Sequence, residues 1–387
     1  MATQFVASGG GANTNMSAFE KLRHFNWGLL LVIAATAGIG FAMLYSAGNG
    51  NTDPWMTRQA VRFAGGFCAL IVVALVDFRF WLRQAYPLYG LAFLLLIYVS
   101  VAGHVGMGAQ RWINVGFIQL QPSELMKISL ILALARYFHG LSYEDIGKPL
   151  NIVLPIAMVL IPAGLVLLQP DLGTAGMLVL GGALMFFAAG VRLWKFAVVL
   201  AGGLSAVPIA WNFLRDYQKD RILTFLNPES DPLGAGYHIM QSKIAFGSGG
   251  LFGKGFLQGS QSHLNFLPER QTDFIFTMLA EEFGMVGGLV LLGLYALLIA
   301  YGLAIGLRSR NQFGRLVAVG LAGNLFLYVF INMAMVMGLI PVVGVPLPLI
   351  SYGGTAMLTV LVGFGLIMSV YINRDLRIGR RGGVGDD

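Results

Sequence analysis

Residues 267–276 read Leu267-Pro268-Glu269-Arg270-Gln271-Thr272-Asp273-Phe274-Ile275-Phe276, and an apolar segment over about 278–307 follows. This is the one place where a dense cluster of ionisable groups runs straight into an apolar segment. A carboxylate that is carried into lipid must be compensated by other groups. Asp273 is therefore the first residue that needs an explanation, and Glu281 and Glu282, which follow it closely, are the next.

The composition of the chain indicates a membrane protein. Of its 387 residues, 57% are hydrophobic and 11% are charged, whereas globular proteins have roughly 45–50% apolar and 25% charged residues. The apolar residues form continuous runs instead of the alternation of a β-barrel, so the spans are expected to be helices. The single cysteine, Cys68, excludes an intrachain disulfide. The sequence predicts an all-α integral membrane protein.

Ten apolar segments have about the length of a tilted helical span, which needs about 20 residues. They lie at about 27–47, 60–77, 85–103, 122–138, 151–168, 172–190, 194–213, 278–307, 314–340 and 353–373. Ten transmembrane helices place both termini on one side of the membrane. We expect one membrane domain over residues 25–374, with flexible cytoplasmic tails at residues 1–24 and 375–387.

Basic residues orient these helices. Loops on the side of the termini carry most of the Lys and Arg residues, whereas the short loops and helix ends opposite carry only Arg58, Arg62 and Arg111, with Lys127 just inside a helix. The positive-inside rule makes the side of the termini cytoplasmic. The long connection over residues 214–272, between the seventh and eighth helices, is then extracytoplasmic, and loops of this length are usually functional or disordered.

Three sites with carboxylates each allow two interpretations. Glu124 and Lys127, three residues apart, form a structural ion pair or line a water-filled cavity. Asp171 caps a helix, or it contacts a substrate or partner. Asp273 caps the eighth helix, or it is a general base at the lipid–water boundary. The residue pattern alone leaves these alternatives open.

The long loop combines cations, aromatic residues and glycines. Its basic residues suit a ligand with an anionic headgroup and an apolar tail. The glycines of residues 247–255 let the backbone approach a ligand closely, or they only add flexibility. His238 has no cysteine or second histidine at ligand spacing, so no metal site is expected there. No Gly-x-Ser-x-Gly motif occurs, which argues against a hydrolase.

Several motifs together resemble those of the SEDS family of shape, elongation, division and sporulation proteins. The motifs occur in the order of the family, and the resemblance covers nearly the whole chain, from about Phe25 to Asp375. The matching pieces are Arg111-Trp112-Ile113, Gln121-Pro122-Ser123-Glu124 with Lys127, Gln169-Pro170-Asp171-Leu172-Gly173-Thr174, Gly236-Tyr237-His238, Gln241-Ser242, Leu267-Pro268-Glu269 with Thr272-Asp273-Phe274-Ile275-Phe276, Glu281-Glu282, and Pro346-Leu347-Pro348-Leu349-Ile350-Ser351-Tyr352-Gly353-Gly354.

The resemblance implies a ten-helix peptidoglycan glycosyltransferase that polymerises lipid II at the outer face of the bacterial cytoplasmic (inner) membrane. Its implied partner is a class B penicillin-binding protein, a transpeptidase that cross-links the product. Asp273 matches the essential aspartate of the family, and Lys127 and Glu124 match its cavity partners. Asn265 and the pair Arg270-Gln271 depart from division-type members and favour an elongation enzyme.

Glycosyl transfer from a pyrophosphate donor needs one base, because the leaving group needs no protonation, and it needs cations that stabilise the leaving anion. We therefore expect Asp273 to be the base and Lys127 to orient or tune it. The sequence assigns no cofactor and leaves a divalent cation such as Mg2+ open. The expected partners include membrane lipids and exclude nucleic acid. The expected substrate-binding residues are Arg111, Arg221, His238, Gln241, Ser242, Lys243, Glu269, Arg270, Thr272 and Ser351.

Two other functions remain open at this stage. A lipid II flippase or another transporter also places Glu, Lys and Asp inside a membrane. The motif-bearing loops, however, are concentrated on the outer face, which favours an enzyme there. A non-catalytic scaffold of a wall-synthesis complex would tolerate substitution of Asp273.

Overall fold

The structure is a computed structural model that describes residues 17–106, 109–115, 118–213, 216–227, 235–264, 269–376 and 378–379. Eight helices in this part are long and apolar enough to cross a membrane. These eight helices are α2 (Trp27–Ala47), α3 (Trp55–Leu75), α4 (Phe78–Ala102), α7 (Pro149–Leu168), α8 (Leu172–Ala189), α13 (Ile275–Arg308), α14 (Gln312–Val336) and α15 (Gly354–Ile372).

The remaining two predicted spans are also helical. They correspond to α5 (Pro122–His139), which carries Glu124, Lys127 and Arg136, and to α9 (Leu193–Phe213), whose apolar part ends at Pro208. The helical membrane fold is thus confirmed, while the count of ten spans stays a prediction. Shorter helices complete the described residues: α1 (Ala18–Arg23), α6 (Tyr143–Ile146), α10 (Asp216–Leu226), α11 (Ala235–Ser248) and α12 (Ser260–His263).

One small antiparallel sheet departs from the all-α prediction. Its strands, β1 (His104–Gly106), β2 (Ala109–Val115) and β3 (Ile118–Leu120), lie in the order β1-β2-β3 between α4 and α5. Ile113 faces Leu120, and Val115 faces Ile118. The β-branched Ile113, Val115 and Ile118 favour extended backbone, but the segment is too short and polar for a span, and its sequence predicts a loop.

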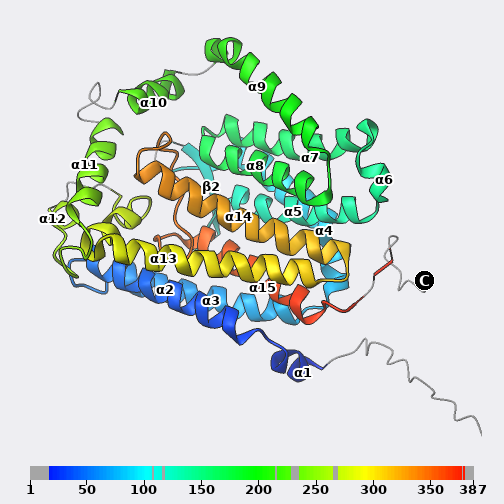
Figure 1. The fold of residues 1–387 in the computed structure, drawn as a ribbon, viewed down its shortest axis with the longest axis horizontal. Coiled ribbons are helices and arrows are strands. Elements are labelled where there is room, and N and C mark those ends of the chain that lie inside the picture. The colour runs from blue at the N-terminus through cyan, green and yellow to red at the C-terminus, as the bar shows by residue number, and fades with distance from the viewer. Residues whose placement is uncertain are drawn as a thin grey trace, which may run out of the picture.

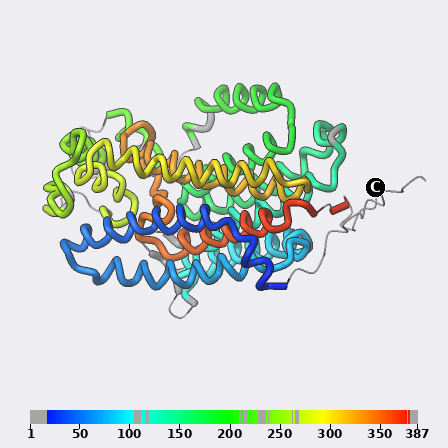
Figure 2. Tube along the Cα trace, turned by 60° about the horizontal axis from the view of Figure 1, so that its bottom comes forward, coloured from blue at the N-terminus to red at the C-terminus, as the bar shows by residue number. Residues whose placement is uncertain are grey.

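The two ends of the described chain lie together. In Figure 1, α1 and the residues that follow α15 lie at the right-hand end of the bundle, whereas α10, α11 and α12 lie toward the left-hand end. Figure 2, turned by 60°, shows the same arrangement. Most of the two predicted tails, residues 1–16 and 380–387, lies outside the described residues.

The core centres on α14 and α15, the most buried of the eight candidate spans. Figure 1 shows α13 running alongside α14, with α2 and α3 on the other side of α13. Gly302 of α13 brings the two helices close, because a Cβ atom there would lie 2.8 Å from the Cβ of Ala322. Small residues commonly allow such approach between membrane helices. Helix α9 lies at the edge of the bundle in Figures 1 and 2, and Val198, Val199 and Leu200 are exposed on it.

Helix α13 is interrupted, although the sequence predicts one continuous span over 278–307. Gly284 has φ 64° and ψ −161°, which is outside the helical region. The part that follows, residues 285–308, still exceeds the roughly 20 residues that a span needs. The break therefore divides α13 into a short outer half, Ile275 to Phe283, and a long half that can cross the membrane alone.

Candidate active site

Asp273 lies just before α13, at the end of a tight turn that starts at Glu269. The N-cap residue of α13 is Phe274, and no side chain caps this helix. The hydroxyl of Thr272 contacts Glu269 instead, donating to its Oε2 at 3.0 Å and to its carbonyl at 3.1 Å. The structure thus disagrees with the capping interpretation of Asp273 and leaves its carboxylate available.

The backbone around Asp273 is fixed from two sides. Asn332 of α14 donates its Nδ2 hydrogens to the carbonyl of Asp273 at 2.9 Å and to that of Val345 at 2.7 Å. Ser351 donates to the carbonyl of Thr272 at 2.6 Å. Asp273 is therefore positioned by α14 and by the loop before α15, and its side chain takes no part in this anchoring.

Burial and like charges set the proton affinity of Asp273. Burial, together with the negative charges of Glu269 and Asp171, raises the pKa of its carboxyl to about 6. Among the described residues, none donates a hydrogen bond to this carboxylate, which would lower its pKa. A general base works best when its pKa lies near the working pH, so this environment suits a base.

Glu124 and Lys127 form a buried ion pair on α5, with Nζ and Oε1 2.6 Å apart and side chains only 4% and 2% exposed. The hydroxyl of Tyr328, on α14, donates to Glu124 and accepts from Lys127. The ring of Tyr328 also lies 4.2 Å from the ammonium nitrogen. The ion-pair interpretation of these two residues is confirmed, and Tyr328 joins α14 to the pair.

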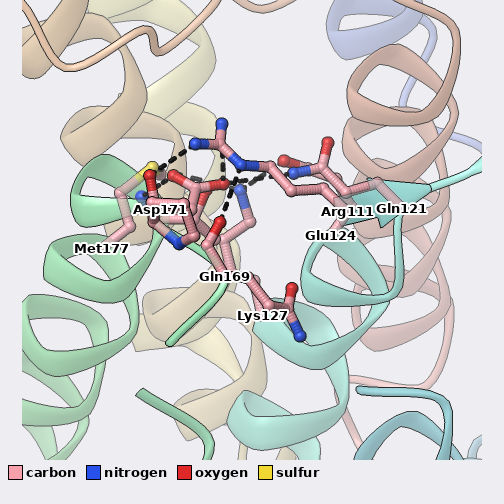
Figure 3. Close-up of polar contacts among 9 residues, drawn as sticks. Arg111, Gln121, Glu124, Lys127, Gln169, Asp171 and Met177 are labelled. Carbon is pink, nitrogen blue, oxygen red and sulfur yellow. Dashed lines mark hydrogen bonds and ion pairs between the residues drawn. The ribbon is translucent and has the colours of Figure 1, made fainter. Parts of the chain in front are cut away.

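A second polar cluster lies next to this pair, at the turn between α7 and α8 (Figure 3). Asp171 caps α8, since its carboxylate accepts from the backbone and the hydroxyl of Thr174 at 3.0 Å each. Arg111, from β2, donates to the carbonyls of Gln169 and Pro170 and lies 3.7 Å from the Asp171 carboxylate. The capping interpretation of Asp171 is confirmed, and Arg111 anchors the same turn.

The charge of Asp171 connects Asp273 electrostatically with the cluster of Glu124, Lys127 and Tyr328. This charge acts on Asp273 as well as on Tyr328. By contrast, the hydrogen bonds of the Lys127 ammonium go to Glu124, Tyr328 and the Met177 sulfur. The expected direct tuning of Asp273 by Lys127 stays a prediction, because the influence visible in the structure comes from Asp171 and Glu269.

Hydroxyl groups that were expected to bind substrate are engaged inside the protein. Ser242 is fully buried, and its hydroxyl lies 2.8 Å from that of Thr277 and donates to the Val336 carbonyl at 2.7 Å. Ser351 also accepts from the backbone of Leu347 at 2.7 Å. In this geometry both serines hold segments together, and their contact with substrate stays a prediction.

The other expected substrate-binding residues differ in exposure. Lys243 and Glu269 are exposed, Gln241 is half-buried, and Arg270 is buried, which lowers the pKa of its guanidinium. The side chains of Arg221 and His238, and the whole of Asn265, lie outside the described residues.

Comparison with known proteins identifies the fold. A model of the FtsW, RodA and SpoVE cell cycle proteins matches residues 25–376. The peptidoglycan glycosyltransferase MrdB of Escherichia coli K12 is 45% identical over 369 residues, which cover 94% of this chain and 98% of MrdB. The chain belongs to the SEDS family.

Two solved structures are similar to this SEDS protein. One is a chain from a peptidoglycan synthase complex in which polymerization and crosslinking are coordinated, with a TM-score of 0.81 and 36% identity over 91% of this chain and 99% of that one. The other is the rod shape determining protein RodA of Thermus thermophilus, with a TM-score of 0.70 and 33% identity over 91% and 98% of the two chains. The similarity to RodA agrees with the elongation-type motifs.

Two residues of this SEDS site were missed from sequence, Tyr328 and Asn332. Both lie on α14 and are buried, at the spacing of one helical turn. Together with Asn324 they place polar groups at every fourth position of an apolar segment, which puts them on one face of the helix. That spacing is a signal that could have found them.

Glu281 and Glu282 bind groups of the long loop. Glu281 pairs with Lys254 at 2.7 Å, and Glu282 accepts from Ser46 at 2.5 Å and lies 3.2 Å from the Nε2 of His263. Glu281 thus pairs with a lysine of the loop, and Glu282 with a serine of α2 and a histidine of α12. Within the described residues, no group of three or more His, Cys, Asp or Glu side chains is placed to hold a metal ion.

Proposed function

We propose that this SEDS protein is a peptidoglycan glycosyltransferase that polymerises lipid II, with Asp273 as the general base. The observation that carries the assignment of the base is its carboxylate, which is neither a helix cap nor a hydrogen-bond acceptor within the described residues and has a pKa of about 6. The relatives named peptidoglycan glycosyltransferase, similar over nearly the whole chain, support the activity.

The reaction is a displacement at the anomeric carbon of the donor sugar. The 4-hydroxyl oxygen of the acceptor forms the new bond to that carbon while Asp273 takes the hydroxyl proton. The bond between the anomeric carbon and the phosphate oxygen breaks, and undecaprenyl pyrophosphate leaves with the electron pair. This group leaves as an anion, so a second carboxyl acid is not needed, in contrast to canonical glycoside hydrolysis.

Cations near the site stabilise the leaving pyrophosphate. Lys243, on α11, is exposed, and its side chain lies against Gly338, which follows the end of α14. Arg270 is buried beside Asp273 in sequence and is more weakly hydrated than a lysine would be. We assign both to the pyrophosphate, with Arg221 as a further candidate. Lys127, in its pair with Glu124, lines a small pocket between α5, α8 and α14.

The proposed placement in the membrane follows the charge pattern. We infer ten transmembrane helices, with both termini in the cytoplasm and the long loop at the outer face of the bacterial inner membrane. The arrangement of α1 and the residues after α15 at one end of the bundle supports this topology. The similarity to a chain of a peptidoglycan synthase complex supports a class B penicillin-binding protein as the partner.

Replacement of Asp273 tests this function directly. In purified protein with its transpeptidase partner, Asp273→Asn is expected to lower polymerisation of lipid II by at least about 100-fold, the range that loss of a general base causes. Glycan products are resolved by gel electrophoresis, and Asp145→Asn, at the opposite end of the molecule, is the control. Polymerisation at the parental rate would refute the assignment, and movement of labelled lipid II across liposomes without polymer would favour the flippase.

A further inference from the structure

The break in α13 is bridged by a distant part of the chain. In a continuous helix, the amides of Met285 and Val286 would donate to the carbonyls of Glu281 and Glu282. Here, Met285 donates to Gly250 at 2.9 Å and Val286 donates to Leu251 at 3.1 Å. The two carbonyls that are left accept from Lys254 and Gly255 at 3.0 Å each. Residues 249–255, which we call the inserted turn, therefore replace two hydrogen bonds of the helix.

Glycines make this insertion possible. A Cβ atom on Gly249 would lie 2.0 Å from the carbonyl oxygen of Ala280, and one on Gly253 would lie 2.1 Å from that of Glu282. Gly253 and Gly284 also have positive φ angles, 80° and 64°, which residues with a side chain rarely adopt. The glycines of the loop thus allow close approach to α13, a role that neither of the two interpretations from the sequence included.

Side chains fasten the inserted turn to the outer half of α13. The carboxylate of Glu281 is fully buried and accepts from Lys254 at 2.7 Å and from the backbone of Gln261 at 2.9 Å. Glu282 is fastened in the same way to His263 and, on α2, to Ser46. A folded protein is strongly destabilised when a buried carboxylate loses its cationic partner. These contacts therefore fix the position of the loop on the helix.

Contacts with the loop help to hold the outer half of α13. At Gly284 the two helical hydrogen bonds of Met285 and Val286, which would align the two halves, are replaced by bonds to the inserted turn. Ser242 of α11 also contacts Thr277, one helical turn before Glu281, so a second helix of the loop holds this half. Asp273 lies two residues before this half-helix, so the loop contributes to its position together with Asn332 and Ser351.

We propose that Lys254 and Glu281 are positioning residues for Asp273, acting through the inserted turn and the outer half of α13. This proposal rests on the proposed function. Neither residue touches the substrate, so their loss changes the geometry of proton transfer while leaving lipid II binding in place. A misplacement of about 1 Å in a reacting group can cost on the order of 100-fold in rate.

The test compares Lys254→Met with Lys254→Arg and with Lys148→Met. Lys254→Met removes the partner of Glu281, Lys254→Arg keeps a cation there, and Lys148→Met removes an exposed ion pair of similar length, 2.6 Å, at the other end of the molecule. We expect Lys254→Met to lower kcat at least about tenfold with KM for lipid II within about twofold. Lys254→Arg should recover most of the rate, and Lys148→Met should match the parental protein.

Two further measurements separate positioning from a general loss of stability. The acid limb of the rate profile should move to lower pH in Lys254→Met, because a displaced Asp273 becomes more hydrated and its pKa falls. Glu281→Gln, which keeps an acceptor for Gln261, should show the same shift with a smaller loss of rate. Parental kcat and an unmoved acid limb in both variants would overturn the proposal. The proposed function fails separately, if Asp273→Asn keeps its activity.

Discussion

Asp273 owes its properties to what surrounds its carboxylate. Its backbone carbonyl is anchored by Asn332, and the preceding carbonyl is anchored by Ser351. The carboxylate itself is half-buried near two other negative charges. A nearby charge can therefore change the pKa of Asp273 without a direct contact, and Glu269 carries such a charge.

The variant Glu269→Gln tests this influence. As a base, Asp273 must be deprotonated, so the rate should rise with pH through about 6 and level off above it. The charge of Glu269 raises the pKa of Asp273, and its removal should therefore move the acid limb to lower pH. Gln keeps an oxygen acceptor for the Thr272 hydroxyl, which limits other effects.

Initial rates of lipid II polymerisation, measured from about pH 4.5 to 8 at constant ionic strength, report the midpoint. Glu144→Gln, on α6 at the opposite end of the molecule, is the control and should leave the midpoint in place. A midpoint that is the same in Glu269→Gln and in the parental enzyme would contradict this account of Asp273.

The sequence predicted single residues where local spacing decides their contacts. Glu124 and Lys127 are neighbours on any helix, and Asp171 stands directly before an apolar segment, where a cap is expected. Tyr328 was missed because its contact with that ion pair joins residues about 200 positions apart in the chain. The distance between Lys127 and Asp273 likewise depends on how three helices pack, which no local pattern contains.

At the scale of elements, the loop between α14 and α15 is as important as any helix. It holds Ser351, and its backbone packs directly on α2 at Gly40, where a Cβ atom would lie 2.7 Å from the carbonyl oxygen of Leu349. From α3, Gln59 donates to the carbonyl of Ser351 at 2.8 Å. Two helices from the beginning of the chain therefore support the segment that anchors Asp273.

Substitution of two glycines on α2, Gly40 and Gly38, tests this support. Gly40→Ala should destabilise the protein by on the order of 1–3 kcal/mol and lower activity, because the new methyl group meets fixed backbone. Gly38→Ala is the control, since nothing lies within 4 Å of its Cβ position. Alanine favours a helix by up to about 1 kcal/mol over glycine, so this control should be neutral or more stable.

Thermal unfolding in detergent and the rate of polymerisation are measured on both variants. Equal stability of Gly38→Ala and Gly40→Ala would show that the loop adjusts without cost, and the support from α2 would then be absent.

The positions of the helices were predictable because apolar length decides membrane insertion. The break at Gly284 was not, since the residue pattern on both sides of it is helical and glycine is common in membrane helices. Only the inserted turn explains it, and this turn lies about 30 residues earlier in the chain. The small sheet was missed for a similar reason, because its strands are short and are stabilised by pairing with each other.

At the scale of the whole molecule, the proposed topology separates two surfaces. Phe19 on α1 is 73% exposed and Leu264 after α12 is 64% exposed, and they lie toward opposite ends of the bundle. Single cysteines at these positions, in a Cys68→Ala background, should react differently with a membrane-impermeant thiol reagent. We expect Leu264→Cys to be labelled in cells with a permeable outer membrane and intact inner membrane, and Phe19→Cys only after lysis.

Each variant is also labelled after lysis, as a control for the reactivity of its thiol, and Cys68→Ala alone corrects for background. Labelling of both cysteines in cells with an intact inner membrane, or of Phe19→Cys alone, would contradict the proposed topology.

The break in α13 also bears on how the chain is made. The insertion machinery recognises an apolar stretch, and residues 285–308 supply one without help from the segment that carries Asp273. The outer half of α13 can therefore be delivered across the membrane as part of the loop and fold onto the inserted turn afterwards. Substitutions that change the pKa of Asp273 and substitutions that alter membrane insertion thus fall on different segments. The pKa of the base can therefore vary among descendants of this sequence while membrane insertion is kept, and the reverse also holds.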